Sequence, residues 1–361
     1  MRLFVVTGKV TDSVIEGFLP AAARLGLDVT LLSDRPGDYP GHRVIGCDVT
    51  DYREIVQVGR PDAYFSNSDH LQAATALAAS FHDLPGKDWK AALRCKNKAL
   101  MRRALGDVGA WEWPVPADAP FPLVVKPREG VASEDVVLVR SAAELAALPD
   151  FGRPMVAEEY LRGELHTLET LNGRVIGSFH TTVSPEPYFI EERLDWAQPP
   201  PETPQVLAAL AGLGVGLGAC HTEFIVGGGR ARIVEVNYRV IGDHCDFLLA
   251  DLLGRDLFAD ILRAHLGEPV EITPGPAAAA SVDYVLATSS GTLTSAPPFT
   301  ETVIGDVRLT YRPQLPVGSR VEHTHTNRDY LGTIQAVGPT TAAVDAALLA
   351  FRAARSWDLT A

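Results

Sequence analysis

The sequence predicts a mixed fold, of α/β and α+β type, in three parts. These are an N-terminal doubly wound α/β domain over residues 1–90, a central two-part domain over residues 91–273 and a small β-rich C-terminal domain over residues 274–361. Three observations predict this division. Short apolar strands alternate with helices up to residue 90, a β-hairpin with a polar face occupies residues 221–243, and a Pro- and Gly-rich stretch at residues 273–276 precedes a strand-rich tail.

The N-terminal domain is expected to begin with a strand at residues 3–7 and a helix at residues 12–25. The remaining elements expected here are strands at 29–32, 43–47 and 63–66 and an Ala-rich helix at 71–81. Ser66, Asn67 and Asp69 follow the last strand, at the sheet edge where open α/β sheets bind ligands. A capped turn explains these three residues equally well.

The central part is expected to contain helices at residues 87–105, 141–148, 204–217 and 244–266. β-Structure is expected over residues 121–161, and the Asn172-Gly173 turn predicts a hairpin over residues 165–183. Pro-rich segments predict a connection at 111–122 and a loop over a site at 188–204. The tail is expected to close with a helix at residues 341–355.

The hairpin carries the residues with the clearest chemistry. Its strands are expected at residues 222–226 and 231–238, and a three-residue loop between them places Glu223 opposite Glu235. Because strand side chains alternate between faces, Asn237 and Arg239 continue the face of Glu235. Carboxylate and amide oxygens suit Mg²⁺, which takes one or two carboxylates together with substrate phosphates. A surface hairpin with solvated charges is the alternative interpretation.

The order of these residues resembles a known metal-binding signature. Glu223 with Glu235-x-Asn237-x-Arg239, followed by Gly242-Asp243, is similar to the signature of the ATP-grasp superfamily. Members of that superfamily join a carboxylate to an amine or another nucleophile through an acyl phosphate. The spacing of the two glutamates matches biotin carboxylase, and Asn-Tyr-Arg stands where Asn-Pro-Arg is usual. The resemblance implies an ATP-grasp domain over residues 91–273, with a lid at about residues 115–163.

The resemblance also implies the residues that bind ATP. Lys126 and Lys98 match the two phosphate-binding lysines, although a snorkelling lysine and a solvated helix face are the respective alternatives. The loop at 127–135 matches the phosphate-covering loop, but has one glycine, Gly130, where most members have several. The remaining expected contacts are Ser133 in that loop, Glu158, Glu159, Tyr160 and Leu161 at the adenine, and Glu164 at the ribose, where a plain acidic turn is the alternative.

The metal and reaction residues follow from the same resemblance. Glu223, Glu235 and Asn237 are expected to hold two Mg²⁺ ions, with Mn²⁺ able to replace them. Arg239 and Lys126 are the expected catalytic residues, since an arginine fork neutralises charge on a transferred phosphoryl group. His180, Arg193, Asp243 and His244 are candidates for contacts with an acidic substrate, and each taken singly also fits a structural role. The pair His323-x-His325 fits an exposed strand better than a metal site.

The function expected from the resemblance is an ADP-forming carbon–nitrogen ligase acting on a small-molecule carboxylate and an amine. Ligases of this size that resemble the chain make amino-acid conjugates, dipeptides or siderophore amides. One alternative is a carboxylase or purine-pathway enzyme that activates bicarbonate or a small acid. A further alternative is a non-catalytic ATP-binding regulator, which the Gly-poor loop favours and the intact hairpin signature disfavours.

Composition limits the partners. The 361-residue chain is 46% hydrophobic and 21% charged, with a formal net charge of −13. A strongly acidic balance argues against general binding to nucleic acid or to an anionic membrane, and no apolar run reaches transmembrane length. The four cysteines are scattered and show no metal-binding spacing, which favours free thiols and a cytoplasmic location. A homodimer is compatible with these properties.

Overall fold

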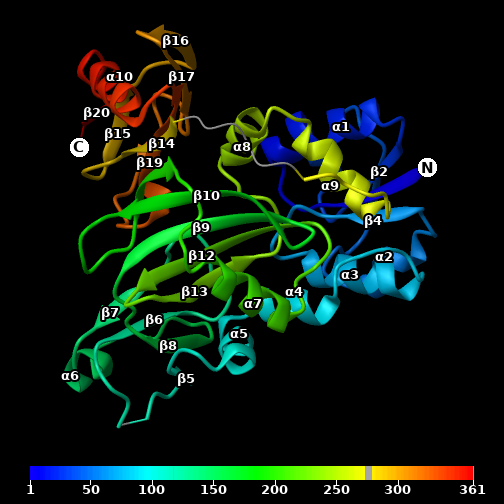
Figure 1. The fold of residues 1–361 in the computed structure, drawn as a ribbon, viewed down its shortest axis with the longest axis horizontal. Helices are drawn as coiled ribbons and strands as arrows, with labels where there is room; N and C mark the ends of the chain where they lie inside the picture. The colour runs from blue at the N-terminus through cyan, green and yellow to red at the C-terminus, as the bar shows by residue number, and fades with distance from the viewer. Residues whose placement is uncertain (117, 273–278, 361) are drawn as a thin grey trace.

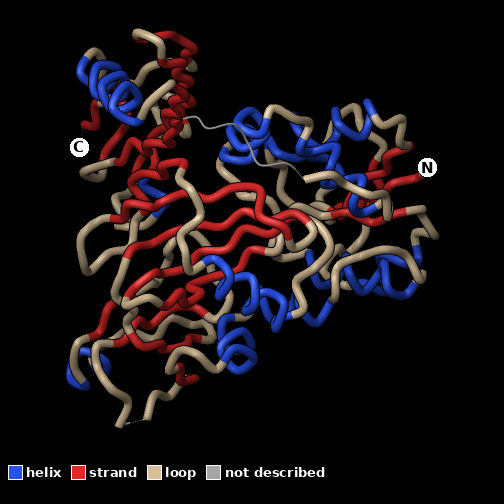
Figure 2. The backbone as a smooth tube through the Cα atoms, viewed as in Figure 1, coloured by secondary structure: helices blue, strands red, loops and turns tan. Residues whose placement is uncertain are grey.

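The computed structural model describes residues 1–116, 118–272 and 279–360. Figure 1 shows a small α/β unit at the N-terminal end, a long sheet through the middle and a smaller sheet beside it. The same elements appear in Figure 2, where strands dominate the centre and helices lie around it. The Pro- and Gly-rich stretch at 273–276 lies outside the described residues, so the domain boundary there stays a prediction.

The N-terminal unit is a four-stranded parallel sheet of strand order β3-β2-β1-β4. Its strands are β1 (Arg2–Val6), β2 (Asp28–Ser33), β3 (Val44–Gly46) and β4 (Ala63–Phe65). The expected first helix is a π-helical segment, Ser13–Phe18, followed by α1 (Leu19–Arg24). The helix α3 (Gln72–Phe81) was expected, whereas the short α2 (Tyr52–Gln57) was not. This unit therefore has the predicted α/β alternation.

The single helix predicted at residues 87–105 is wrong. Two helices, α4 (Trp89–Lys96) and α5 (Lys98–Leu105), meet at Asn97, whose φ of −99° and ψ of 106° are extended rather than helical. The Asn97 side chain accepts a hydrogen bond from the Leu100 N–H and caps α5. Lys98 therefore lies at the start of a helix and not in the middle of one.

The smaller sheet is antiparallel, with strand order β5-β8-β6-β7. It consists of β5 (Ala110–Glu112), β6 (Leu123–Pro127), β7 (Val137–Val139) and β8 (Met155–Glu159), with the short helix α6 (Ala142–Ala146) beside it. The expected connection at 111–122 begins inside β5, because Trp111 pairs with Ala157 of β8. This sheet lies next to the long sheet in Figure 1.

The long sheet has nine strands, in the order β13-β12-β9-β10-β11-β14-β19-β17-β16. The strands from the central part are β9 (Glu164–Leu171), β10 (Arg174–Val183), β11 (Glu191–Trp196), β12 (Ala219–Gly227) and β13 (Arg230–Asn237). The loop predicted at 188–204 is wrong over β11, which pairs with β10 and β14 on its two sides. Pairing with β10 and with the distant β14 makes a strand of a segment whose prolines and aromatics predict a loop.

The C-terminal strands continue this sheet. They are β14 (Ala279–Leu286), β16 (Thr300–Ile304), β17 (Val307–Pro313) and β19 (Tyr330–Gly338). A separate three-stranded sheet is formed by β15 (Gly291–Ser295), β18 (Arg320–Val321) and β20 (Asp358–Thr360), and α10 (Thr341–Ala353) lies over β14, β17 and β19. The β11–β14 ladder thus joins the predicted central and C-terminal parts by backbone hydrogen bonds.

The hairpin of β12 and β13 has the predicted pairing of Glu223 with Glu235, but its loop differs from the predicted one. Its loop has two residues, Gly228 and Gly229, with φ of 59° and 71°, and not three. A two-residue loop alone would place Glu223 opposite Val234, but a β-bulge after Glu223 shifts the pairing by one residue. Glu223 therefore lies opposite Glu235, as predicted.

The remaining helices pack on the hairpin and on the N-terminal unit. The helix α7 (Thr203–Leu213) packs on β13, and α9 (Leu257–His265) packs on α1 and β4. The long helix predicted at 244–266 is wrong, because Gly254 ends α8 (Cys245–Leu253) with a φ of 61°. No helix among the described residues is long and apolar enough to cross a membrane.

Candidate functional site

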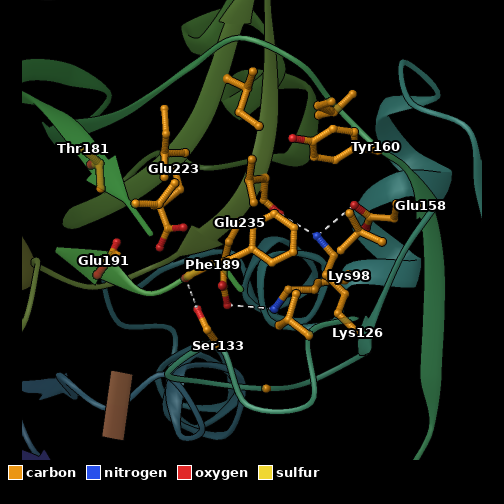
Figure 3. Close-up of a pocket in the computed structure, with 18 of the residues that line it drawn as sticks. Lys98, Lys126, Ser133, Glu158, Tyr160, Thr181, Phe189, Glu191, Glu223 and Glu235 are labelled. Atoms are coloured by element: carbon orange, nitrogen blue, oxygen red, sulfur yellow. Dashed lines mark hydrogen bonds and ion pairs between the residues drawn. The ribbon is translucent and has the colours of Figure 1, made fainter. Parts of the chain in front are cut away.

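A cavity of about 440 Å³ lies between the smaller sheet and the long sheet. Its walls come from β6, β8 and β9 to β13, and the loop after β6 covers one side. Figure 3 shows Lys98 and Lys126 pointing into this space, toward the carboxylates of Glu235 and Glu158. Every residue expected to bind nucleotide lines this cavity: Lys98, Lys126, Ser133, Glu158, Glu159, Tyr160, Leu161 and Glu164.

Lys126 and Glu158 form a buried ion pair on adjacent strands of the smaller sheet. The Lys126 Nζ lies 2.8 Å from Glu158 Oε2, and Arg102 Nη2 donates to the same oxygen at 2.7 Å. Burial by itself would raise the pKa of Glu158, but Lys126 and Arg102 lower it to about 2. Burial lowers the pKa of Lys126, and Glu158 opposes that shift. The carboxylate therefore favours the charged form of the lysine against the effect of burial.

Lys98 and Glu235 form the second pair. The Lys98 Nζ lies 2.9 Å from Glu235 Oε1, and the lysine side chain is only 6% exposed. Burial would lower the pKa of Lys98, but Glu235 raises it, and Lys98 in turn lowers the pKa of Glu235 against the effect of burial. The break at Asn97 makes this contact available, because it starts α5 at Lys98. The sequence interpretation of Lys98 as part of one solvated helix face is wrong.

A chain of acidic groups and one histidine runs from β9 across β12 and reaches the cavity at Glu223. His221 Nδ1 lies 2.7 Å from Glu169 Oε1, and His221 Nε2 lies 3.7 Å from Glu223 Oε1. Burial lowers the pKa of His221, but the two glutamates raise it to about 10. Burial, and then Glu223, raise the pKa of Glu191, which also lines the cavity, to about 8. His221 therefore serves as the shared cationic partner of Glu169 and Glu223.

Sequence reasoning missed Glu191 as a residue that lines the cavity, and it missed Glu169 and His221 as a buried pair next to Glu223, outside the lining. His221 precedes Glu223 by two residues on β12, so strand alternation was a signal that could have found it. Glu191 lay within a predicted loop, and nothing local marks it as a strand residue facing a cavity. Glu169 lies opposite His221 because β9 pairs with β12. This pairing joins strands that are separated in the sequence, so no local pattern reveals it.

The loop after β6 has an unusual backbone. Ala132, Ser133 and Asp135 have φ of 58°, 55° and 55°, in the left-handed region that favours glycine. Each costs about 1 kcal/mol or more relative to glycine. The Ser133 hydroxyl donates to the Phe189 carbonyl at 2.9 Å, as Figure 3 shows. The loop therefore adopts a conformation typical of a glycine-rich segment although only Gly130 in it is glycine.

The end of β8 and the residues after it form another side of the cavity. Glu159 accepts hydrogen bonds from the Gly109 N–H at 3.0 Å and from Arg232 Nη1 at 3.0 Å. The Tyr160 hydroxyl donates to Glu186 at 2.6 Å. The Glu164 side chain is 75% exposed, and its Oε2 lies 3.7 Å from His166 Nε2.

Other candidate residues lie away from the cavity wall. Arg239 pairs with Asp69 of the N-terminal unit, with its Nη2 at 2.9 Å from Asp69 Oδ2. Arg193 pairs with Asp195 and Asp345, and His244 with Asp12 at 2.7 Å. His180 lines the cavity, whereas Arg193, Asn237, Arg239, Asp243 and His244 are absent from its lining. The structure thus joins Arg239 to Asp69, two candidates from distant parts of the sequence.

The donor set of the hairpin fits a hard cation. Glu223 and Glu235 face each other across the ladder, and both line the cavity. Among the described residues, no three His, Cys, Asp or Glu side chains gather closely enough to hold a metal by themselves. Mg²⁺ commonly takes one or two carboxylates and completes its shell with phosphates and water, so two facing glutamates suit an ion that arrives with a nucleotide.

Comparison with known proteins finds one similar sequence and several similar folds. No family model matches the chain. An uncharacterized protein of Sinorhizobium fredii, y4rH, is 25% identical to it over 394 residues, covering 96% of this chain and 80% of the relative. An L-amino acid ligase from Bacillus licheniformis superposes with a TM-score of 0.79 at 21% identity, over 100% of this chain and 99% of that one.

Two further solved structures extend the likeness. A phosphoribosylglycinamide synthetase from Anaerococcus prevotii gives a TM-score of 0.72 at 14% identity, over 99% of both chains. An N5-carboxyaminoimidazole synthetase from Staphylococcus aureus, complexed with ADP, gives 0.68 at 14% identity, over 98% of this chain and 96% of that one. The chain therefore has the ATP-grasp fold. Within this class, the likeness to the L-amino acid ligase extends over both chains almost completely.

Proposed function

We propose that the protein is an ATP-dependent, ADP-forming ligase that activates a small carboxylate as an acyl phosphate and joins it to an amine. The observation that carries this proposal is the meeting of two buried lysines with facing glutamates on the walls of one cavity. Lysines that are removed from water, with carboxylates as their ionic partners, are suited to receive the phosphates of a nucleotide. The activity of the L-amino acid ligase, which has the same fold, supports an amino-acid substrate.

The proposed reaction has two steps. An oxygen of the substrate carboxylate attacks the γ-phosphorus of ATP, the bond from that phosphorus to the bridging oxygen breaks, and ADP leaves. The amine nitrogen then attacks the acyl carbon, and the carbon–oxygen bond to phosphate breaks. The products are an amide, inorganic phosphate and a proton that passes to water.

The residue roles are assigned as follows in this proposal. Lys98 and Lys126 bind the phosphates, and the loop at 127–135, with Ser133, covers them. Arg239 neutralises charge on the transferred phosphoryl group, which requires it to exchange Asp69 for the phosphoryl oxygens. Glu158, Glu159, Tyr160 and Leu161 contact the adenine, and Glu164 contacts the ribose.

The metal is assigned to the hairpin. Glu223, Glu235 and Asn237 would hold two Mg²⁺ ions, or Mn²⁺ in their place. When bound, these ions neutralise charge on the β- and γ-phosphates. Lys98 pairs with the Glu235 carboxylate at 2.9 Å and holds it in the position where it would bind the cation.

Several assignments of the substrate side also remain proposals. His180 lines the cavity and is placed to contact a substrate directly. Arg193, Asp243 and His244 would serve only a substrate that extends beyond the cavity. The domain limits at 90 and 273, the lid at about 115–163, a homodimer, a cytoplasmic location and a role in natural-product or siderophore biosynthesis belong to the same proposal.

The test is ADP release with Mg²⁺ and ATP over a matrix of carboxylates against amines, beginning with the L-amino acids in both roles. Release that requires one acid and one amine is expected, with the amide detected by mass spectrometry. Release that requires bicarbonate would instead support the carboxylase alternative. Tight ATP binding by calorimetry without release for any pair would support the regulator.

A further inference from the structure

One residue of the C-terminal part reaches the cavity of the central part. Asn327 begins a 3₁₀ turn, Asn327–Asp329, immediately before β19, and it lines the cavity beside the loop after β6. About 190 residues of sequence separate it from that loop. No motif of the sequence marks it, and the resemblance to ATP-grasp ligases assigns it no role.

Asn327 joins two walls of the cavity. Its backbone N–H donates to the Ala132 carbonyl of the loop at 3.1 Å. Its side-chain Oδ1 accepts from the Glu191 N–H at 3.1 Å, and its Nδ2 donates to Glu191 Oε2 at 3.4 Å. The backbone of Asn327 therefore holds the loop, and its side chain fixes that backbone to β11.

The turn that carries Asn327 is itself rigidly held. Asp329 is 1% exposed and accepts hydrogen bonds from the Thr324 N–H, the Thr324 hydroxyl and the His325 N–H, all at 2.7–2.8 Å. His325 stacks on Tyr188, with ring centroids 4.1 Å apart and planes 4° apart. These contacts fix the turn that carries the Asn327 N–H independently of the loop after β6.

The loop needs such a contact because its backbone is strained. Ala132 and Ser133 both have left-handed φ, which residues other than glycine adopt only when their surroundings impose it. Asn327 contacts the carbonyl of Ala132 itself, the first of the residues with left-handed φ in this loop. The ion pair of Arg328 with Glu134, at 2.8 Å, adds an exposed contact of lesser weight.

We propose that Asn327 is a positioning residue, whose backbone N–H holds the phosphate-covering loop in the conformation that ATP-grasp proteins usually obtain with glycines. This inference rests on the proposed ATP binding. It explains how a loop with one glycine can cover phosphates, and it makes ATP affinity depend on the C-terminal part of the chain.

The test distinguishes the side-chain hydrogen bonds of Asn327 from the hydrogen bond that its backbone N–H donates. Asn327→Ala removes only the side-chain bonds, whereas Asn327→Pro also removes the N–H. Proline suits the first position of the turn, and Thr326 before it has φ of −132° and ψ of 174°, which proline tolerates in its predecessor. Each variant is made in the wild-type loop and with Ala132→Gly, which removes the strain at that residue.

Binding of Mg·ATP is measured by calorimetry on the full chain, and folding is checked by thermal unfolding. In the wild-type loop, Kd is expected to rise about threefold for Asn327→Ala and about tenfold or more for Asn327→Pro. With Ala132→Gly present, the two variants are expected to differ by less than about twofold. Glu322→Ala, an exposed change in the same segment, serves as the control with unchanged Kd.

Two results would overturn the inference, and they are distinguishable. Suppose that the wild type binds ATP and that Asn327→Ala and Asn327→Pro raise Kd equally in the wild-type loop. The inference about the Asn327 N–H would then be wrong, while the proposed function would stand. Absence of ATP binding by the wild type itself would overturn the proposed function together with this inference.

Discussion

The ammonium of Lys98 lies 2.9 Å from the carboxylate of Glu235, on the floor of the cavity between the two sheets. Lys98 is a proposed phosphate ligand and Glu235 is a proposed metal ligand. In the structure, each side chain is the ionic partner of the other. The pair balances charge that would otherwise be buried and uncompensated. Under the proposed function, binding of Mg·ATP would replace this ion pair by a contact of Lys98 with phosphate and a contact of Glu235 with the metal.

Lys98→Met should weaken ATP binding. It removes a charged hydrogen-bond donor worth about 1.5–3 kcal/mol, which corresponds to roughly a tenfold to hundredfold rise in Kd. Calorimetry with Mg·ATP measures the change. Lys90→Met, at an exposed lysine of α4, is the matched control and should leave Kd unchanged. Equal affinity of Lys98→Met and the wild type would remove Lys98 from the site.

Glu158→Gln should destabilise the fold by about 3–5 kcal/mol, because Arg102 and Lys126 lose their shared buried counter-charge. The folded-state pKa of Glu158 is about 2, below its ordinary value of 4.5, so the carboxylate stabilises the fold above pH 4.5 and loses this contribution as pH falls toward 2.

Denaturant unfolding at pH 7, 5, 4 and 3 checks this prediction. The gap in unfolding free energy between wild type and Glu158→Gln should be constant down to about pH 4.5 and shrink below it. Glu112→Gln removes the partner of Arg103 and Arg128 at a site 38% exposed, and should cost less than about 1 kcal/mol. A gap independent of pH would contradict the assignment of the shift to Glu158.

Glu235→Gln and Asn237→Ala should abolish turnover while the fold survives. Under the proposed function both remove ligands of the metal that neutralises charge on the phosphates, and a loss of at least about 100-fold in ADP release is expected. Circular dichroism should match the wild type. Glu301→Gln, exposed on β16 at the far edge of the long sheet, should retain full activity. Near-normal ATP consumption by either hairpin variant would refute the metal assignment.

Gly229→Ala should destabilise the protein by about 1–2 kcal/mol, because Gly229 has a φ of 71° in the turn of the hairpin. An added Cβ meets nothing within 4 Å there, so the effect isolates backbone conformation. Gly212→Ala is the matched control in α7, also without contacts, and should stabilise by about 0.5–1 kcal/mol. Thermal and denaturant unfolding of the two variants should therefore shift in opposite directions.

The sequence by itself determined the elements that have a strong local pattern. Alternating polar and apolar residues placed Glu223 and Glu235 on one face, and the resemblance carried by Glu235, Asn237 and Arg239 led to the ATP-grasp fold that the solved structures share. The residues expected at the nucleotide, from Lys98 to Glu164, all line one cavity, because they lie at the ends of strands and helices whose order the sequence shows.

Only the tertiary structure decided which distant groups meet. The loop predicted at 188–204 contains β11, which pairs with the distant β14. The extended Asn97 that starts α5 and the bulge in the hairpin are local features that the residue pattern did not reveal. Long-range pairing also brings His221 to Glu169, Arg239 to Asp69 and Asn327 to Ala132. Such contacts leave no periodic signal in the chain, because their energy comes from burial and charge supplied by other elements.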